Sequence, residues 1–389
     1  MKPVLHILAA TICVCTLPFV PSTVSAASPA PASAPAAAVS KTEARQAIAK
    51  GLAWLKAHQN EDGSWSNQDQ PALSALPLMA FVSSPEGAGT NTSRPEFLQK
   101  ALGFIRSKAK PDGSIWEKGL SNYNTSVCLT ALVTNGDPKD EALTARANAF
   151  IVGLQAKNMS DESFDGGIGY GNAVSPNHPH PDLDNTLLAL EALRTYKNAH
   201  SAQEAPKSPD LNWQAAIDFI SRCQNLPETN PKGSKDPADR GGFIYYPGYS
   251  NAAPEDNSNP LRSYGTMTYA GLLSFIYADL KKDDQRVQAA LDWLKKNYTV
   301  DQNPVMGAAG FYYYLHLMSK GLTAAGIKEF ETADGRKIDW AHDAARKILQ
   351  VQTADGSWVN DKSARWMEKD PVLVTSYCVL ALELLDDKL

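Results

Sequence analysis

The sequence contains little cysteine and little histidine, with five Cys and seven His in 389 residues. Cys13 and Cys15 lie in an N-terminal apolar run, so Cys128, Cys223 and Cys378 are left for the folded part of the chain. These three are far apart, and each lies in an apolar helical stretch, which is typical of small buried hydrophobic side chains. We therefore predict no structural disulfide, no bound metal ion and no other cofactor.

An excess of positive charge is also missing. The chain has 37 Lys and Arg residues against 42 Asp and Glu residues, which gives a formal net charge of -5. A protein that binds nucleic acid usually carries a basic surface, because phosphate contacts supply much of the affinity. We therefore predict no nucleic-acid partner, and the sequence indicates no particular partner protein.

Long apolar runs are missing beyond Val20. The run from Val4 to Val20 is short for a bilayer span and is interrupted by Pro18. It follows a basic start and ends in a small-x-small sequence before Ala27, which is the pattern of a cleaved secretory signal at residues 1–26. We therefore expect an exported protein (periplasmic, extracytoplasmic or secreted) with no transmembrane anchor once the signal is removed.

Residues 27–40 are almost entirely Ala, Pro and Ser. Such a segment cannot bury enough apolar surface to offset the entropy of ordering it, so we predict a flexible linker. The remaining residues, 41–389, then form one folded domain. That is large for a single domain but reasonable for a repeat array.

One segment, residues 50–65, returns in five degenerate copies further along the chain. Leu52 and Leu55 lie at the spacing of an amphipathic helix, and the Asp-Gly turn at 62–63 ends that helix. A second, more apolar helix is expected around residues 73–81. Each repeat is therefore predicted to contain an outer helix, a turn and a buried helix.

Three features mark the copies, namely an aromatic-aliphatic pair, a glutamine after it and a glycine turn. The pair Trp54-Leu55 is matched by Phe104-Ile105, Phe150-Ile151, Phe219-Ile220 and Trp293-Leu294, and by Lys347-Ile348, which has lost the aromatic residue. The glutamine recurs as Gln59, Gln155, Gln224 and Gln352 and is replaced by Ala109 and Tyr298 in the other two copies. We expect its amide to bond backbone groups left open at the end of the outer helix, and Trp65 to pack back on that helix.

This pattern resembles the QW repeat of squalene and oxidosqualene cyclases, which also recurs in the β subunits of protein prenyltransferases. The resemblance covers residues 42 to 387. It implies an all-α fold, an α/α toroid in which six helical hairpins close into a ring with the second helix of each pair inside. The repeats alone would also allow an open superhelix.

Several aromatic and polar residues stand near the starts of the expected inner helices. They are Asn124, Asn185, Tyr264, Tyr269, Tyr313, Trp366 and Tyr377. If the ring is hollow, these residues would line a cavity that binds an isoprenoid, a peptide or another small ligand. Alternatively, the aromatic rings simply fill the middle of the protein.

The segment Asp182-Leu183-Asp184-Asn185 resembles the DxDD motif with which squalene-hopene cyclases protonate a terminal alkene. The resemblance implies that Asp184 is the acid and that Asp182 assists it, while Asn185 departs from the motif. The alternative is that Asp182 caps a helix and Asp184 complements its positive end, an environment that favours the carboxylate over the acid.

The sequence offers two candidate metal sites and favours neither. Prenyltransferases hold catalytic zinc partly through a His, and Met267 occupies that position here, so we expect no prenyltransferase activity. His178 and His180 stand close to Asp182 and Asp184, but the intervening prolines favour an exposed loop.

Two insertions interrupt the repeats, at residues 156–181 and 225–262, and we expect both on one rim of the ring, where they could form a lid. Three functions remain open. The first is an exported protein that binds an apolar or extended ligand without catalysis, and the second is a terpene cyclase that uses Asp184. The third is a glycan-acting enzyme with a carboxylate from the segment 368–370 near Trp366.

Overall fold

The computed structural model describes residues 38–84, 94–171, 179–201, 209–332 and 335–389. Within these ranges twelve α-helices alternate between an outer and an inner layer. The outer helices are α1 (Lys41–Ala57), α3 (Glu96–Ser107), α5 (Glu141–Gly153), α7 (Trp213–Arg222), α9 (Gln285–Lys296) and α11 (Trp340–Gln350). The inner helices are α2 (Ala72–Ser83), α4 (Ser121–Asn135), α6 (Leu183–Ala199), α8 (Gly265–Tyr277), α10 (Phe311–Ala324) and α12 (Pro371–Leu385).

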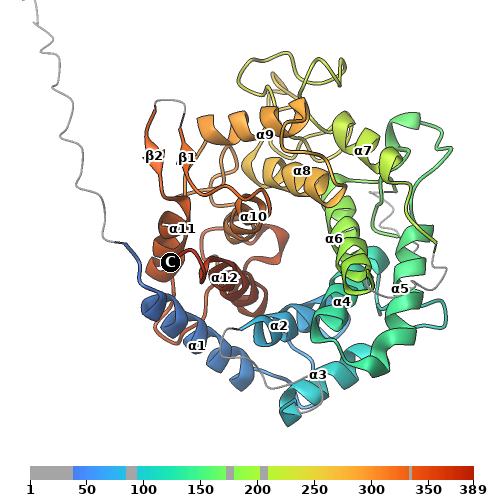
Figure 1. Cartoon of the computed structure of the whole chain (residues 1–389), viewed down its shortest axis with the longest axis vertical. Helices are drawn as coiled ribbons and strands as arrows, with labels where there is room; N and C mark the ends of the chain where they lie inside the picture. The colour runs from blue at the N-terminus through green and yellow to red at the C-terminus, as the bar shows by residue number, and fades with distance from the viewer. Residues whose placement is uncertain (1–37, 85–93, 172–178, 202–208, 333–334) are drawn as a thin grey trace, which may run out of the picture. The chain divides into compact units, whose positions relative to one another are not determined.

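The inner helices close into a ring (Figure 1). Each one packs against the next, and the last, α12, packs against the first, α2. The described chain also contains the 3-10 turns η1 (Pro138–Asp140), η2 (Glu162–Phe164) and η3 (Arg365–Met367) and one short hairpin of β1 (Phe330–Glu331) and β2 (Lys337–Ile338). The prediction of an α/α toroid of six helical hairpins is confirmed.

The two layers differ in how their side chains are buried. Outer helix α1 buries a single stripe that includes Ile48, Trp54 and Leu55, whereas inner helices such as α8 and α12 are buried almost all round. An inner helix is covered on one side by the outer layer and on both flanks by its neighbours, which explains its apolar sequence. In the part of the chain that the structure describes, no helix is both long and apolar enough to cross a membrane.

The glycine of the repeated turn has a positive φ in five of the repeats. The angle lies between 88° and 93° at Gly63, Gly113, Gly166, Gly241 and Gly356. In each case a Cβ atom would also collide with the next outer helix, as Gly63 would with Lys100 and Gly356 with Lys50. Glycine is therefore required both by the backbone conformation and by the close approach of neighbouring repeats.

The repeated glutamine links adjacent repeats. The amide nitrogen of Gln59 donates to the carbonyl of its own turn, at Gly63 (2.9 Å), and to that of Phe97 in the next outer helix (2.8 Å). Gln352 does the same with Gly356 (2.9 Å) and with Ala47 of α1 (3.0 Å), which joins the last repeat to the first. The role differs from the predicted one, because the second carbonyl belongs to the following repeat and not to the end of the same helix.

Hydroxyl side chains of the inner helices hold the turns in place. The backbone N–H of Trp65 donates to Ser74 Oγ (2.9 Å), and Trp358 N–H donates to Thr375 Oγ1 (3.0 Å). Thr125, Thr186 and Thr268 accept equivalent bonds from Ile115, Ile168 and Phe243. The indole N–H of Trp65 donates to Leu55 O (2.7 Å), so this ring packs back on its own helix as expected.

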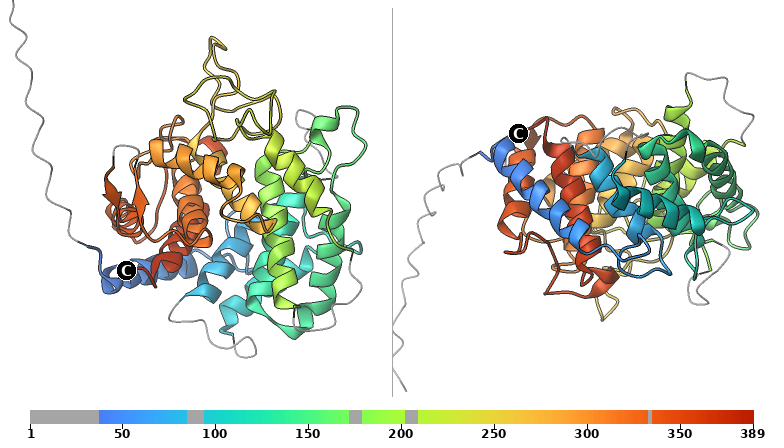
Figure 2. Two further views of the ribbon diagram at one scale, coloured as in Figure 1. Left: turned by 45° about the horizontal axis from the view of Figure 1, so that its top comes forward. Right: turned by 90° about the horizontal axis from the view of Figure 1, so that it is seen from below.

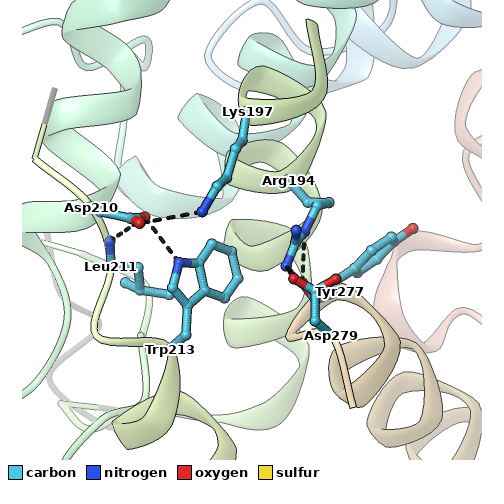
Figure 3. A network of polar contacts seen from close by, with 7 residues as sticks. All are labelled: Arg194, Lys197, Asp210, Leu211, Trp213, Tyr277 and Asp279. Carbon is cyan, nitrogen blue, oxygen red and sulfur yellow. Dashed lines mark hydrogen bonds and ion pairs between the residues drawn. The ribbon is translucent and has the colours of Figure 1, made fainter. Parts of the chain in front are cut away.

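A network at the C-terminal ends of α6 and α8 fastens these helices together (Figure 3). The Arg194 guanidinium donates to the backbone carbonyl of Tyr277 and pairs with Asp279 (2.7 Å). It also stacks over Trp213, whose indole N–H donates to Asp210 (2.9 Å). Because this network satisfies the carbonyl of Tyr277, the last residue of α8, it fixes the spacing of α6 and α8 at the end opposite the repeat turns.

Candidate active site

The inner ring encloses a cavity of about 660 Å³. Each inner helix contributes residues to its wall, and on all of them except α8 the lining residues recur at the three-, four- and seven-residue spacings of one helix face. On α10 these residues are Tyr313, His316, Leu317 and Lys320, and on α12 they are Leu373, Tyr377, Leu380, Glu383 and Leu384. The aromatic side chains therefore surround a space large enough for a small molecule rather than filling it.

Six of the nine residues predicted for the site line this cavity. They are Asp184, Asn185, Tyr264, Tyr313, Trp366 and Tyr377. Asp182, Asn124 and Tyr269 are not among the lining residues.

Asn124 and Tyr269 have structural positions. Asn124 Oδ1 accepts from the N–H of Ala72 (3.0 Å), and its amide donates to Gln70 (2.8 Å), so this side chain satisfies the start of α2. Tyr269 is fully buried, with its ring 5.6 Å from that of Tyr314 on the neighbouring inner helix. A position near the start of an inner helix therefore does not ensure that a side chain faces the cavity, because the other faces of these helices pack against the outer layer and against both neighbours.

Asp182 caps helix α6, as one of the sequence interpretations expected. Its Oδ1 accepts from the backbone N–H of Asn185 (2.8 Å), and its Oδ2 accepts from the amide of the same residue (2.8 Å). The side chain of Asp182 is fully buried. Asn185 therefore donates two bonds to Asp182. These bonds hold the buried carboxyl group of Asp182 next to Asp184, which faces the cavity.

Asp184 projects into the cavity from the first turn of α6, and Tyr313 Oη donates to its Oδ1 (2.7 Å). Burial is the main cause that raises the pKa of Asp184 to about 7, and the charge of Asp182 raises it further, while the bond from Tyr313 opposes the change. We expected the helix end to favour the carboxylate. Burial outweighs that effect, so a large fraction of Asp184 keeps its proton at neutral pH.

The two insertions meet beside Asp184, and each contributes a tyrosine to the cavity. Tyr170 Oη and Tyr245 Oη lie 3.0 Å apart, and both residues line the cavity. The carbonyl of Tyr245 also accepts from Leu183 N–H (2.8 Å), which ties the second insertion to the start of α6. Figure 2 shows much of that insertion, between α7 and α8, standing clear of the helices. These tyrosines were not predicted, because no repeat pattern extends into the insertions.

A second polar contact joins the same two helices further along the cavity. Lys320 Nζ on α10 and Glu191 Oε1 on α6 lie 2.7 Å apart, and both line the cavity. Each lies two helical turns beyond a member of the Tyr313–Asp184 pair. His316 lies on α10 between Tyr313 and Lys320, and the centre of its ring is 5.3 Å from that of Tyr377. Burial lowers the pKa of His316 well below its ordinary value.

The acidic groups considered for glycan chemistry do not face the cavity. Glu368 accepts from the N–H of Tyr313 (2.8 Å) and from the amide of Asn360 (2.6 Å), so it satisfies the start of α10. Asp370 caps α12 by accepting from Val372 N–H (2.9 Å). Neither residue is among those that line the cavity, although the adjacent Trp366 is.

The residues considered for metal binding are placed apart. His178 lies outside the described residues, and the ring of His180 stacks on Phe164 at 4.5 Å. Met267 lines the cavity as an apolar side chain. Within the described ranges, no group of three or more His, Cys, Asp or Glu side chains is arranged to hold a metal ion, and Cys128, Cys223 and Cys378 are free and buried.

No family model matches this chain, and no curated protein matches it. Solved structures do match. The type II terpene cyclase MstE from Scytonema has a TM-score of 0.54 at 13% identity, over 90% of this chain and 100% of that one. An inactive variant of the α-1,6-mannanase GH76A of Salegentibacter, bound to α-1,6-mannotriose, has a TM-score of 0.55 at 9% identity, over 89% and 100% of the two chains.

A possible member of the GH105 family from Klebsiella pneumoniae is also similar, with a TM-score of 0.51 at 10% identity over 91% of this chain and 96% of that one. At these identities the likenesses show the α/α-toroid fold. The same fold therefore occurs in a terpene cyclase and in a glycan-acting enzyme, and the choice between such functions depends on the site itself.

Proposed function

We propose that this protein is an isoprenoid cyclase that starts its reaction by protonating a carbon–carbon double bond, with Asp184 as the general acid. One observation carries the proposal: a carboxyl group with a pKa of about 7 faces an aromatic and apolar cavity at the centre of the ring. An acid that retains its proton near neutral pH, next to space that suits an apolar ligand, is what such a reaction needs.

The first step transfers the Asp184 proton to the less substituted carbon of a double bond. A C–H bond forms, the π electrons of the double bond supply it, and a cation is left on the more substituted carbon. The next double bond attacks that cation and closes a ring, and a proton lost at the end completes the balance. Tyr313 already donates to Asp184, so it stabilises the carboxylate that the transfer leaves.

The cavity walls suit the cationic stage. Tyr123, Tyr170, Tyr245, Tyr264 and Tyr377 line the cavity with Asp184, and the faces of such rings attract positive charge. Much of the remaining lining is aliphatic, with Leu and Met side chains from several inner helices. A terpene cyclase of the same fold has been solved with geranylgeranyl dihydroxybenzoate, its substrate, which supports an isoprenoid ligand here.

The glycan alternative has less support, because Glu368 and Asp370 serve helix starts and leave the cavity without the carboxylate expected from that segment. Binding without catalysis, the other alternative, predicts that the protein retains a prenyl compound and forms no product.

We also propose that the protein is exported after removal of residues 1–26. Mass spectrometry of native protein tests this, and an N-terminus at Met1 would contradict it.

Purified protein incubated with geranylgeraniol and with squalene tests the proposed function. We expect a cyclised product from the wild type and none from Asp184→Asn, which removes the acid but can still accept from Tyr313. Asp283→Asn is the matched control, since Asp283 is exposed on the turn before α9. Product formed equally by wild type and Asp184→Asn would reject Asp184 as the acid, and bound ligand without product would favour a binding protein.

A further inference from the structure

A second acidic side chain lines the cavity, on α12. In the described part of the chain, neither carboxyl oxygen of Glu383 has a hydrogen-bond partner, although both are buried. A carboxyl group without a partner costs free energy when it is buried, so native proteins rarely keep one without a function. Burial alone raises the pKa of Glu383 well above its ordinary value, which favours the neutral acid, a group that can both donate and accept.

Glu383 lies away from Asp184, toward the other end of the cavity. Tyr377 packs against Tyr313, and Tyr313 donates a hydrogen bond to Asp184. Glu383 comes six residues after Tyr377 on α12, which is nearly two turns or about 9 Å along the helix. Other polar residues line the cavity between the middle and the C-terminal ends of the inner helices, namely Ser83, Thr134, Glu191, Thr195 and Lys320. The cavity thus has an acid near one end and a cluster of polar groups near the other, with Leu188, Leu317 and Leu380 between them.

The charges of the lining decide which head group suits the polar end. The described lining contains three carboxyl groups, at Asp184, Glu191 and Glu383, and one ammonium, at Lys320. That ammonium is already paired with Glu191 at 2.7 Å. A diphosphate would therefore meet carboxyl groups without a free cation, which is unfavourable. A hydroxyl, in contrast, can donate to and accept from a neutral carboxyl group at once.

We propose that Glu383 forms a head-group subsite, so that the ligand is a prenyl alcohol or phenol bound with its hydroxyl at Glu383 and its terminal double bond at Asp184. This inference rests on the proposed function for its orientation and names the substrate class of the same cavity. It predicts that a plain hydrocarbon such as squalene binds less well than a prenyl chain with a hydroxyl group.

Binding without turnover tests the subsite. Dissociation constants are measured in the Asp184→Asn background through tryptophan fluorescence, since Trp366 lines the cavity. The probes are geranylgeraniol and the matching hydrocarbon that lacks the hydroxyl. We expect the alcohol to bind about tenfold more tightly, as one good buried hydrogen bond would provide. Equal affinity for the two probes would overturn the inference, and so would failure to bind either one.

Variants at Glu383 separate a binding role from a structural one. Glu383→Leu, added to Asp184→Asn, should weaken binding of the alcohol about tenfold and leave the affinity for the hydrocarbon unchanged. Glu383→Gln should keep most of the preference for the alcohol, because an amide also donates and accepts. Glu255→Leu, at an exposed loop residue, is the control. Loss of affinity for both probes alike, or an unchanged preference in Glu383→Leu, would contradict the assignment.

The two proposals fail in different ways. If Asp184 is not the acid, the preference for the alcohol and its dependence on Glu383 remain, because both are measured without turnover. If Glu383 is not the subsite, product formation still depends on Asp184, but the preference for a hydroxyl is absent or does not change with Glu383→Leu.

Discussion

The phenol of Tyr313 donates a 2.7 Å hydrogen bond to Asp184 Oδ1 and so joins α10 to α6, two helices that both flank α8. Two turns further on, Lys320 and Glu191 make a second 2.7 Å contact between the same helices. The Tyr313–Asp184 bond holds the acid in position and stabilises its anion. The Lys320–Glu191 pair neutralises the charge that Glu191 would otherwise bring into the cavity.

Replacing Tyr313 by Phe should slow the reaction without abolishing it. The hydroxyl stabilises the carboxylate of Asp184, so without it the acid is weaker and proton transfer is less favourable. A hydrogen bond to a charged group contributes about 2 kcal/mol, which corresponds to a fall in kcat of roughly thirtyfold. Product formation under saturating substrate measures it. Tyr312→Phe is the control, since this neighbour does not line the cavity, and an equal loss in both variants would contradict the role given to Tyr313.

The stability of the protein should respond to pH through Asp184. Its pKa is about 7 in the folded state against an ordinary value of 3.8, so its contribution to stability is complete below about pH 4 and is lost as pH rises through 7. At about pH 8 the ionised group should destabilise the fold by on the order of 4 kcal/mol, from a shift of 3.8 to about 7. Asp184→Asn lacks this effect.

Thermal unfolding of wild type and Asp184→Asn at several pH values measures the difference. The melting temperature of the variant should exceed that of the wild type increasingly between about pH 4 and pH 8. Asp283→Asn should show no such trend, because Asp283 is exposed. A difference between Asp184→Asn and wild type that stays constant with pH would mean that burial does not raise the pKa of Asp184.

The closure of the ring can be tested at Gln352. Its amide donates to Ala47 and Gly356, so Gln352→Ala leaves two carbonyls without these bonds and should cost about 2 kcal/mol of unfolding free energy. Gln155→Ala removes the equivalent pair of bonds, to Gly166 and Asn212, between the third and fourth repeats, and also the bond that Gln155 Oε1 accepts from Asn212 N–H (3.0 Å). Denaturant unfolding should therefore show a loss for Gln155→Ala that is at least as large as the loss for Gln352→Ala. A large loss for Gln155→Ala with none for Gln352→Ala would indicate that the contact between last and first repeats does not hold in solution.

The fold could be predicted because each repeat carries residues that determine its local geometry. A glycine with a positive φ, a hydroxyl that holds the turn and an amide that reaches the next helix recur at fixed places, as at Gly356, Thr375 and Gln352. What single repeats could not show is the destination of each bond. The second acceptor of Gln352, Ala47, lies in the first repeat and is adjacent only once the ring is closed.

The site was predicted less completely, for three physical reasons. The first-turn position of Asp184 favours a carboxylate, and only the surrounding cavity reveals that burial outweighs this effect. Tyr170 and Tyr245 come from insertions that have no repeat to predict them, and they meet only in the folded protein. In the sequence Glu383 is an ordinary helix residue, and only the structure shows that its carboxyl group has no hydrogen-bond partner among the described residues.

A reaction in deuterium oxide tests most directly whether Asp184 delivers a proton to a double bond. The acid exchanges with solvent, so the product formed from geranylgeraniol should carry one deuterium at the carbon of the former terminal double bond that received the proton. Mass spectrometry and NMR of the product locate that deuterium. We expect one such deuterium with the wild type and no product with Asp184→Asn. A product that carries no solvent deuterium at that carbon, or the same labelled product from Asp184→Asn, would contradict it.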